Sequence, residues 1–193
     1  EGVFYNSKKT ELLYFAYTEN KWDNLVTLNL ADNNTTLLKI ARRAAENCTT
    51  LQRLVLGENI LTIGERAFAN CEELKIVKYA NQTEWHKTEL NDCFAELKDG
   101  RTLSVQYQAF RDCPKLHSVM FPKINQDSCI SIGSEAFSSC YELRTVILLG
   151  TGNFEISESS FSGCDKEKLV FLVSKDSAAE RFARENGYRY VNV

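Results

Sequence analysis

The sequence predicts an α/β repeat solenoid with a short-stranded parallel sheet, and three observations predict it. First, nearly the same stretch occurs twice, as IGERAFANCEEL from Ile63 to Leu74 and as IGSEAFSSCYEL from Ile132 to Leu143. Second, the apolar positions of this stretch return mostly within about 20 to 29 residues, a period that indicates stacked repeats. Third, apolar residues alternate after each copy, as they do in a half-buried strand.

Composition excludes several classes of protein. The chain has 193 residues, of which 44% are hydrophobic, so it is long enough to bury a core. A formal net charge of −3 leaves no basic stripe, and we expect no nucleic-acid partner. Apolar runs such as Leu169 to Val173 are far shorter than the roughly 18 residues of a membrane helix. The chain opens on Glu1, and we expect a processed or trimmed form of a longer protein.

Each copy of the repeat reads I-x-x-x-A-F-x-x-C-x-x-L-x-x-V-x-L, and we take the Phe as its anchor position. The anchors of the five copies, of which the first is weaker, are Ala45, Phe68, Phe110, Phe137 and Phe161. The cysteines that follow them are Cys48, Cys71, Cys113, Cys140 and Cys164. The spacing from anchor to cysteine never changes, because every coil must match its neighbour at the same depth.

The repeat predicts two local structures. In L-x-x-V-x-L, a turn leads into a short strand in which the Val and the last Leu point into the core. A-F-x-x-C has the spacing of a helical turn, so the Phe and the Cys share a face and enter the core together. One coil alone buries little, whereas stacked coils form a continuous apolar core and a parallel sheet.

We expect the repeat cysteines to form a buried ladder of free thiols. Cysteines at the same place on successive coils lie at the strand repeat of about 4.8 Å, which is wider than the Cβ separation of about 3.5 to 4.5 Å in a disulfide. Buried thiols of this kind behave as small hydrophobic groups. Cys93 and Cys129 lie outside the ladder, and the sequence leaves their redox state open.

Both ends of the array carry further signals. Leu25, Leu28 and Leu30 reproduce the strand pattern before the first anchor and predict an opening coil. A capping box from Ser177 to Glu180, followed by Gly187, predicts a short helix that covers the end of the core. The final YRYVNV then predicts a last strand.

One interval between anchors is longer than the others because of the stretch near 80–103. Within it, Leu90, Cys93, Phe94 and Leu97 follow a helical spacing and predict a helix. We interpret this stretch as an insertion or a degenerate coil on the convex side. A functional lid is the alternative.

The segments IGERAFANCEELKIV and IGSEAFSSCYELRTV resemble the BspA-like leucine-rich-repeat family, found mainly on the surfaces of host-associated bacteria and in some parasitic protists. The stretch from Gly2 to Tyr17 resembles the hairpin that this family places beside its repeats, with Asn6 to Lys9 as the turn. The C-terminal SAAERFARENGYRYVNV resembles the family's terminal cap. The resemblance covers most of the chain and implies an extracellular or cell-surface location.

We therefore expect one leucine-rich-repeat domain over residues 1–193. The N-terminal β-hairpin occupies 1–20, and the repeats occupy 21–173 with the irregular insertion near 80–103. The C-terminal helix–strand cap occupies 174–193.

The sequence shows no pattern of catalytic or metal-binding residues. It has two histidines, His86 and His117, and lacks the C-x-x-C, H-E-x-x-H and G-x-S-x-G motifs. Cys113 lies close to His117 in sequence, but Cys113 belongs to the ladder and His117 is an outward position. A surface histidine is therefore favoured over a catalytic dyad. We expect no enzymatic activity, no metal and no cofactor.

The outward positions of the strands line an exposed sheet face, where we expect a ligand to bind. The first column of this face consists of Arg53, Ile76, Ser118 and Thr145. The second column consists of Val55, Lys78, Met120 and Ile147. Apolar residues of the second column would form an exposed stripe of the kind that often marks interaction sites. Alternatively, they satisfy strand propensity, or the hairpin or a neighbouring domain covers them.

The main functional hypothesis is a non-enzymatic surface or secreted module that binds a protein ligand, such as a host extracellular-matrix or cell-surface protein. The family resemblance implies this role. A structural spacer that presents another domain is the alternative. A third hypothesis, an enzyme that uses Cys93 or Cys113, requires a reactive thiol.

Overall fold

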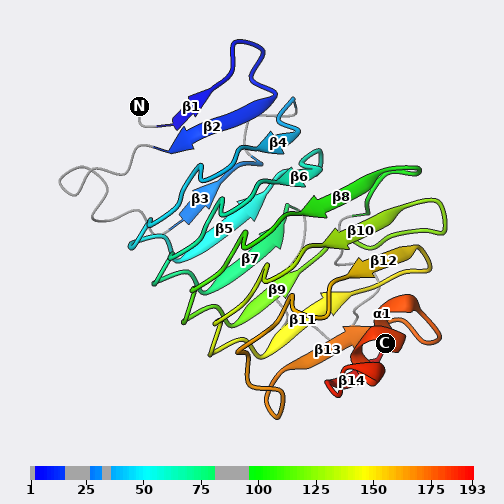
Figure 1. The fold of residues 1–193 in the computed structure, drawn as a ribbon. Helices are drawn as coiled ribbons and strands as arrows, with labels where there is room; N and C mark the ends of the chain where they lie inside the picture. Colours follow the sequence, from blue (N-terminus) through cyan, green and yellow to red (C-terminus); the bar gives the residue numbers. More distant parts are fainter. Residues whose placement is uncertain (1–2, 16–26, 32–35, 81–95) are drawn as a thin grey trace.

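The chain forms a solenoid whose coils alternate between two sheets, with the core between them (Figure 1). The computed structural model describes residues 3–15, 27–31, 36–80 and 96–193. Sheet A contains, in spatial order, β1 (Val3–Tyr5), β2 (Glu11–Phe15), β4 (Lys39–Ile40), β6 (Thr62–Ile63), β8 (Thr102–Val105), β10 (Cys129–Ile132) and β12 (Asn153–Ile156). Sheet B contains β14 (Arg189–Asn192), β13 (Val170–Val173), β11 (Thr145–Leu148), β9 (Ser118–Met120), β7 (Ile76–Tyr79), β5 (Arg53–Leu56) and β3 (Thr27–Asn29).

The predicted fold class is confirmed, and the structure adds a second sheet. Sheet B is the sheet that L-x-x-V-x-L predicts, and its strands pair in parallel throughout. Sheet A forms where the first apolar residue of each repeat lies, as at Ile63, which pairs with Val105 of the next coil. Because β4 and β6 are only 2 residues long, the alternation of a strand is too short there to be recognised.

The A-F-x-x-C segment consists of tight turns and not of the predicted helical turn. Arg66 and Asn70 flank the anchor Phe68 with φ angles of 55° and 59°, which lie in the left-handed region and exclude an α-helix. The amide of Phe68 donates to the carbonyl of Ala109 on the next coil at 2.8 Å, so the turns add their own ladder of hydrogen bonds. The prediction for the side chains is confirmed, because Phe68 and Cys71 are both fully buried.

A polar network covers the solvent side of these turns. Arg66 Nε donates to Glu46 Oε1 at 2.7 Å, and Arg66 Nη1 donates to Gln108 Oε1 at 3.3 Å. Gln108 Nε2 donates to Glu135 Oε2 at 2.8 Å, and Arg111 pairs with the same carboxylate at 2.9 Å. Most of these partners lie on different coils, so the network helps to fix the register of neighbouring turns.

The anchor phenylalanines form a column of stacked rings along the core. The ring centroids of Phe68 and Phe110 lie 5.4 Å apart, with an interplanar angle of 6°. Phe137 continues the column at 5.2 Å from Phe110, and Phe161 follows at 5.3 Å from Phe137. Stacked aromatic pairs add about 0.5 to 1.5 kcal/mol each beyond burial, so this column is a main source of cohesion between coils.

The predicted hairpin is present at the N-terminal end of sheet A. β1 and β2 pair in antiparallel fashion, and β2 then pairs in parallel with β4. In the turn, Asn6 Oδ1 accepts a hydrogen bond from the amide of Thr10 at 2.8 Å, and Lys9 has a φ of 53°. Leu12 and Phe15 of this hairpin are buried and belong to the main core.

The predicted helix and strand are present at the C-terminal end. Helix α1 (Ala178–Glu185) begins after Ser177, whose side chain accepts a hydrogen bond from the amide of Glu180 at 3.1 Å. Gly187 follows the helix with a φ of 72°, in the left-handed region that favours glycine. β14 then pairs in parallel with β13, and it is the last strand of sheet B.

The long interval lies inside one coil, between β7 and β8. Sheet A continues from β6 to β8 and sheet B from β7 to β9, so the stack has no gap there, and whether the stretch is an insertion or a degenerate coil stays a prediction. The predicted helix lies mostly in 81–95, outside the described residues. Its last position, Leu97, is not helical, because the preceding Glu96 forms a parallel bridge with Lys123.

The opening coil is present as far as the structure describes it. Leu28 lies in β3 and Leu30 follows this strand, and both are buried. Leu25 lies outside the described residues.

Candidate functional site

Sheet B aligns the two predicted columns in the predicted register. Each first-column residue is paired with the next, through Arg53, Ile76, Ser118 and Thr145. The second column is aligned in the same way through Val55, Lys78, Met120 and Ile147. We call the surface that these columns line the outer face of sheet B. The register shows that these residues are aligned but does not test whether they bind a ligand, so their role in binding stays a prediction.

The columns extend further than the sequence predicts. The first continues to Val170 and Arg189, and the second continues to Leu172 and Val191. The last coil has a longer turn between Cys164 and its strand, which shifts this strand out of the repeat spacing. The short apolar run VFLV, which is typical of a buried strand, was the signal that could have identified it.

The predicted exposed apolar stripe is wrong at Met120 and Ile147. Met120 is 5% exposed and Ile147 is 1% exposed. They form a second hydrophobic cluster with Leu149 and Leu172, separate from the main core. These apolar side chains pack on one another across neighbouring strands, and the sequence of a single strand cannot show such contacts.

The accessible part of the outer face lies on β5 and β7. Arg53, Val55, Ile76 and Lys78 are all partly exposed there. At the opposite end of the sheet, Val191 on β14 is 50% exposed. The outer face is therefore mixed in polarity at its N-terminal half and apolar and closed in its middle.

Polar side chains line the edge where the strands of sheet B begin. Lys75, His117 and Arg144 directly precede β7, β9 and β11. Lys75 Nζ donates to Gln52 Oε1 at 3.1 Å, and His117 Nε2 lies 3.6 Å from Glu142 Oε2. Sequence reasoning missed this row as a group. The signal was the recurring basic residue directly after the Leu of the repeat.

Cys113 and His117 do not form a catalytic pair. Cys113 is fully buried, and its Sγ donates to the carbonyl oxygen of Phe68 at 3.2 Å. His117 lies at the surface, as the sequence predicts, with 52% of its side chain exposed. The thiol that a dyad would need therefore faces the core, away from any substrate.

The ladder cysteines are free thiols, as predicted. Burial raises the pKa of Cys48, and it raises the pKa of Cys164 to about 11. Both thiols are therefore protonated near neutral pH, which makes them poor nucleophiles. Cys129 is partly exposed on β10. Cys93 and His86 lie outside the described residues.

The described part of the chain lacks two features, a metal-binding cluster and a membrane-spanning helix. Among its residues, no group of three or more His, Cys, Asp or Glu side chains is arranged to hold a metal ion. No helix within it is long and apolar enough to cross a membrane.

Comparison with known families fits the coil geometry described above. A family model described as "BspA type Leucine rich repeat region" matches residues 14–99 and 95–177, with 6 copies. The chain belongs to this family. Leucine-rich-repeat solenoids typically act through extended binding surfaces and not as enzymes. No curated protein matches the chain.

Two solved structures resemble this BspA-type chain. The pneumococcal vaccine antigen PcpA matches with a TM-score of 0.59 and 13% sequence identity, over 100% of this chain and 46% of the antigen. At this identity, the match shows the fold alone. A leucine rich cell surface protein from Faecalibacterium prausnitzii A2-165 matches with a TM-score of 0.29 and 17% identity, over 81% of this chain and 51% of that protein. The chain thus spans about half the length of each protein.

Proposed function

We propose that this chain is a non-enzymatic module of a cell-surface or secreted protein, and that it binds a protein ligand through the outer face of sheet B. The observation that carries the proposal is the alignment of two side-chain columns on strands β5 to β11. Extended faces of this kind suit a protein ligand better than a small molecule. The proposed form of binding is adhesion to a protein of a host or partner cell.

The N-terminal half of the face carries the contacts in this proposal. Arg53 and Lys78 supply positive charge there, and Val55 and Ile76 supply apolar area. Protein interfaces commonly combine an apolar centre with polar groups and are enriched in Arg. Met120 and Ile147 support this half from inside their own cluster and do not contact the ligand.

Membership of the BspA-type family supports the surface location in this proposal. The structurally similar pneumococcal protein is described as a vaccine antigen, which agrees with such a location. Because the chain covers 46% of that antigen, the activity of a longer parent protein is also a matter of proposal.

A binding experiment with matched variants tests the proposal. The purified chain is titrated against extracellular-matrix and cell-surface proteins, beside the double variant Lys78→Glu/Ser118→Arg on sheet B. The control is Thr62→Glu/Ser104→Arg, which changes a directly paired position on the outer face of sheet A. We expect saturable binding by the wild type and the control, and at least about tenfold weaker binding by the sheet B variant.

The structural spacer remains a second candidate because of one observation. The burial of Met120 and Ile147 removes most of the apolar stripe from solvent, so the face exposes less apolar area than the sequence predicts. A spacer predicts that no tested protein binds saturably to the folded chain. Equal binding by the two double variants would instead place the site elsewhere and contradict the use of sheet B.

A further inference from the structure

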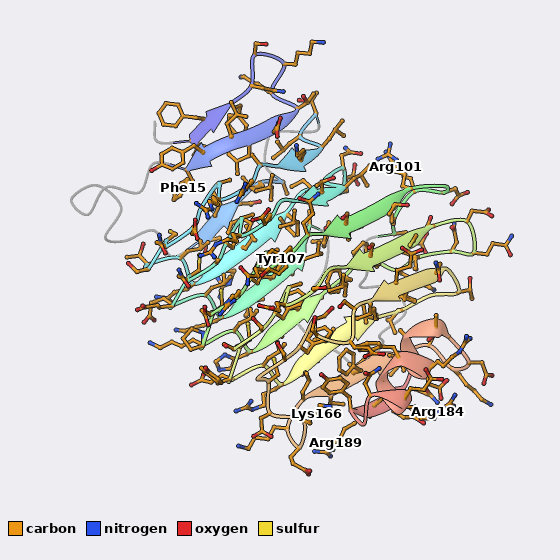
Figure 2. All side chains as sticks on the ribbon, in the orientation of Figure 1. Phe15, Arg101, Tyr107, Lys166, Arg184 and Arg189 are labelled. Carbon is orange, nitrogen blue, oxygen red and sulfur yellow. The ribbon has the colours of Figure 1, made fainter. Side chains whose placement is uncertain are left out.

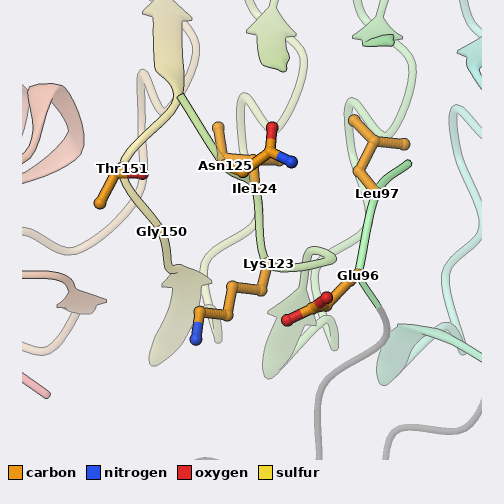
Figure 3. A pocket seen from close by; sticks show the side chains of 7 residues that line it. All are labelled: Glu96, Leu97, Lys123, Ile124, Asn125, Gly150 and Thr151. Carbon is orange, nitrogen blue, oxygen red and sulfur yellow. The ribbon is translucent and has the colours of Figure 1, made fainter. Parts of the chain in front are cut away.

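The last strand of sheet B, β14, has one unpaired edge. β14 pairs in parallel with β13, and no other strand of the described residues pairs with it. It lies at the end of the solenoid opposite the N-terminal hairpin (Figure 1). An unpaired edge presents backbone amide and carbonyl groups to which a further strand can bind. This edge does not include the residues of the pocket in Figure 3, which is lined by 96–97, 123–125 and 150–151.

The hydrogen bonds of the last two strands define which residues of β14 face that edge. The amide of Val193 donates to the carbonyl of Val173 on β13 at 3.0 Å. In a parallel sheet, the backbone groups of alternate residues point to opposite neighbours. Those of Val191 and Val193 therefore point toward β13. The backbone groups of Tyr190 and Asn192 point the other way, toward the unpaired edge.

Apolar side chains are exposed at this edge. Val191 is 50% exposed and Val193 is 45% exposed, and alternation places both side chains on the same face. Val191 follows Ile147 and Leu172 in the second column of sheet B, where those two side chains are buried. The apolar column therefore ends in an exposed residue. An exposed apolar edge of this kind favours a partner that continues the sheet.

β14 also lacks the features that usually prevent pairing at an edge. Its sequence, RYVN, contains no proline and no lysine, and its register with β13 is continuous, without a bulge. Its one charged residue, Arg189, lies at the C-terminal end of the solenoid (Figure 2). Arg189 Nη1 donates to the carbonyl of Glu167 at 3.0 Å, so this side chain is held on its own chain.

A second copy of β14 fits this edge in an antiparallel register centred on Val191. When Val191 of both copies lies on a twofold axis, Tyr190 of each chain lies opposite Asn192 of the other. These are the residues whose backbone groups face the edge, and each such pair exchanges both of its hydrogen bonds. Val191 then occupies a non-hydrogen-bonded pair, where opposing side chains are closest.

Charge and hydrogen bonding favour this register over a neighbouring one. It places Arg189 beside Val193 of the second copy, so the guanidinium groups of the two copies do not face each other. A centre shifted by one residue toward the start of β14 would place Asn192 opposite Tyr188. The amide of Tyr188 already donates to the carbonyl of Ala183 at 2.9 Å and is not available to a partner.

We propose that two copies of this chain associate through their β14 edges and form one continuous sheet across a twofold axis at Val191. The partner is a second copy because the outward-facing backbone groups and the exposed valine are arranged symmetrically about Val191, as an isologous interface requires. This contact lies at the opposite end of sheet B from Arg53 and Lys78. It therefore does not depend on the proposed binding of a protein ligand.

Sedimentation equilibrium of the full chain tests the proposal, with a reductant present because Cys129 is partly exposed. We expect a monomer–dimer equilibrium with a Kd of roughly 100 µM, in the weak range that suits a small interface. Hydrogen exchange of the Tyr190 and Asn192 amides, followed by NMR, should slow as the protein concentration rises. A chain that stays monomeric at about ten times the expected Kd overturns the proposal.

Charge variants at the axis test the register. Val191→Lys and Val191→Glu each bring like charges together across the axis, and each should weaken dimerisation at least about tenfold. An equimolar mixture of the two variants should restore it, because opposite charges then face each other. Leu13→Lys, at a 44% exposed position on the hairpin, is the control and should dimerise like the wild type.

Two outcomes of this comparison contradict the proposed contact. One is that the Leu13 and Val191 variants dimerise alike, which would place the interface elsewhere. The other is that the mixture dimerises no more strongly than either Val191 variant alone, which would exclude a twofold axis at this residue.

Discussion

The Sγ atom of Cys140 donates a hydrogen bond to the carbonyl oxygen of Phe110, one coil earlier, at 3.2 Å. The same contact recurs along the ladder, from each repeat cysteine after Cys48 to the anchor of the preceding coil. The pairs are Cys71 with Ala45 at 3.4 Å, Cys113 with Phe68 at 3.2 Å and Cys164 with Phe137 at 3.3 Å. The cysteines therefore fasten successive coils together and are more than the small hydrophobic groups that the sequence predicts.

Replacing Cys140 with alanine should weaken this contact between coils. We expect Cys140→Ala to lower the free energy of unfolding by about 1 to 2 kcal/mol, because both a hydrogen bond and buried volume are lost. Urea denaturation in the presence of a reductant measures the change. Cys129→Ala, on partly exposed β10, is the matched control and should cost no more than about 0.5 kcal/mol. If both variants lost the same free energy of unfolding, the hydrogen bond of the ladder would make no net contribution to stability.

Phe137 lies in the middle of the aromatic column, and its removal should be costly. We expect Phe137→Ala to lower the free energy of unfolding by about 3 to 5 kcal/mol, because it leaves a cavity between Phe110 and Phe161. Phe4→Ala is the control, since Phe4 is 53% exposed on the hairpin. Thermal and urea unfolding measure both. An unchanged melting temperature for Phe137→Ala would contradict the stacked core.

Ile147 and Lys78 lie in the same column of sheet B but should respond differently to an acidic residue. Ile147→Asp should lower the free energy of unfolding by about 3 kcal/mol or more, because it buries a carboxylate in an apolar cluster. Lys78→Glu, at a partly exposed position, should cost less than about 1 kcal/mol. Circular dichroism and urea denaturation compare the two. A stable Ile147→Asp variant would show that this side chain is reachable by water.

The protein should lose stability in alkaline solution because of the buried thiol of Cys164. Burial raises the pKa of Cys164 in the folded state from its ordinary value of 9.0 to about 11. The stabilising effect is therefore complete below about pH 9 and is lost as the pH rises toward about 11, where the unfolded thiol has released its proton. Urea unfolding across this range, with a reductant present, measures the slope.

The variant Cys164→Ala isolates the contribution of this thiol. Its free energy of unfolding should fall less steeply with pH than that of the wild type, whatever its value at neutral pH. Tyr188, whose pKa burial raises to about 12, adds a loss in the same direction that the variant retains. Parallel slopes for the wild type and Cys164→Ala would contradict the assignment to Cys164.

The repeat spacing identified the core because burial and sequence period have the same cause. The positions of Phe68, Cys71 and Leu74 are apolar in most coils since each coil occupies the same depth in the stack, and all three residues are buried. The register of both columns on sheet B could be predicted for the same reason.

The features that could not be predicted depend on backbone conformation and on contacts between coils, neither of which leaves a periodic pattern in the sequence. The sequence gives no sign that Arg66 has a left-handed φ, because glycine is the residue that usually marks such a position. Met120 and Ile147 are buried and cluster with Leu149 and Leu172, which lie outside the repeat motif or in the last, irregular coil.

The long interval between β7 and β8 has a consequence for how this architecture can vary. Although this connection is longer than the others, hydrogen bonds to the adjacent coils continue in both sheets and through the Phe turns. The stack therefore tolerates a change in the length of the connection between its two sheets. The residues of the sheets and the Phe turns must keep their spacing, whereas the number of residues in this connection can differ from coil to coil.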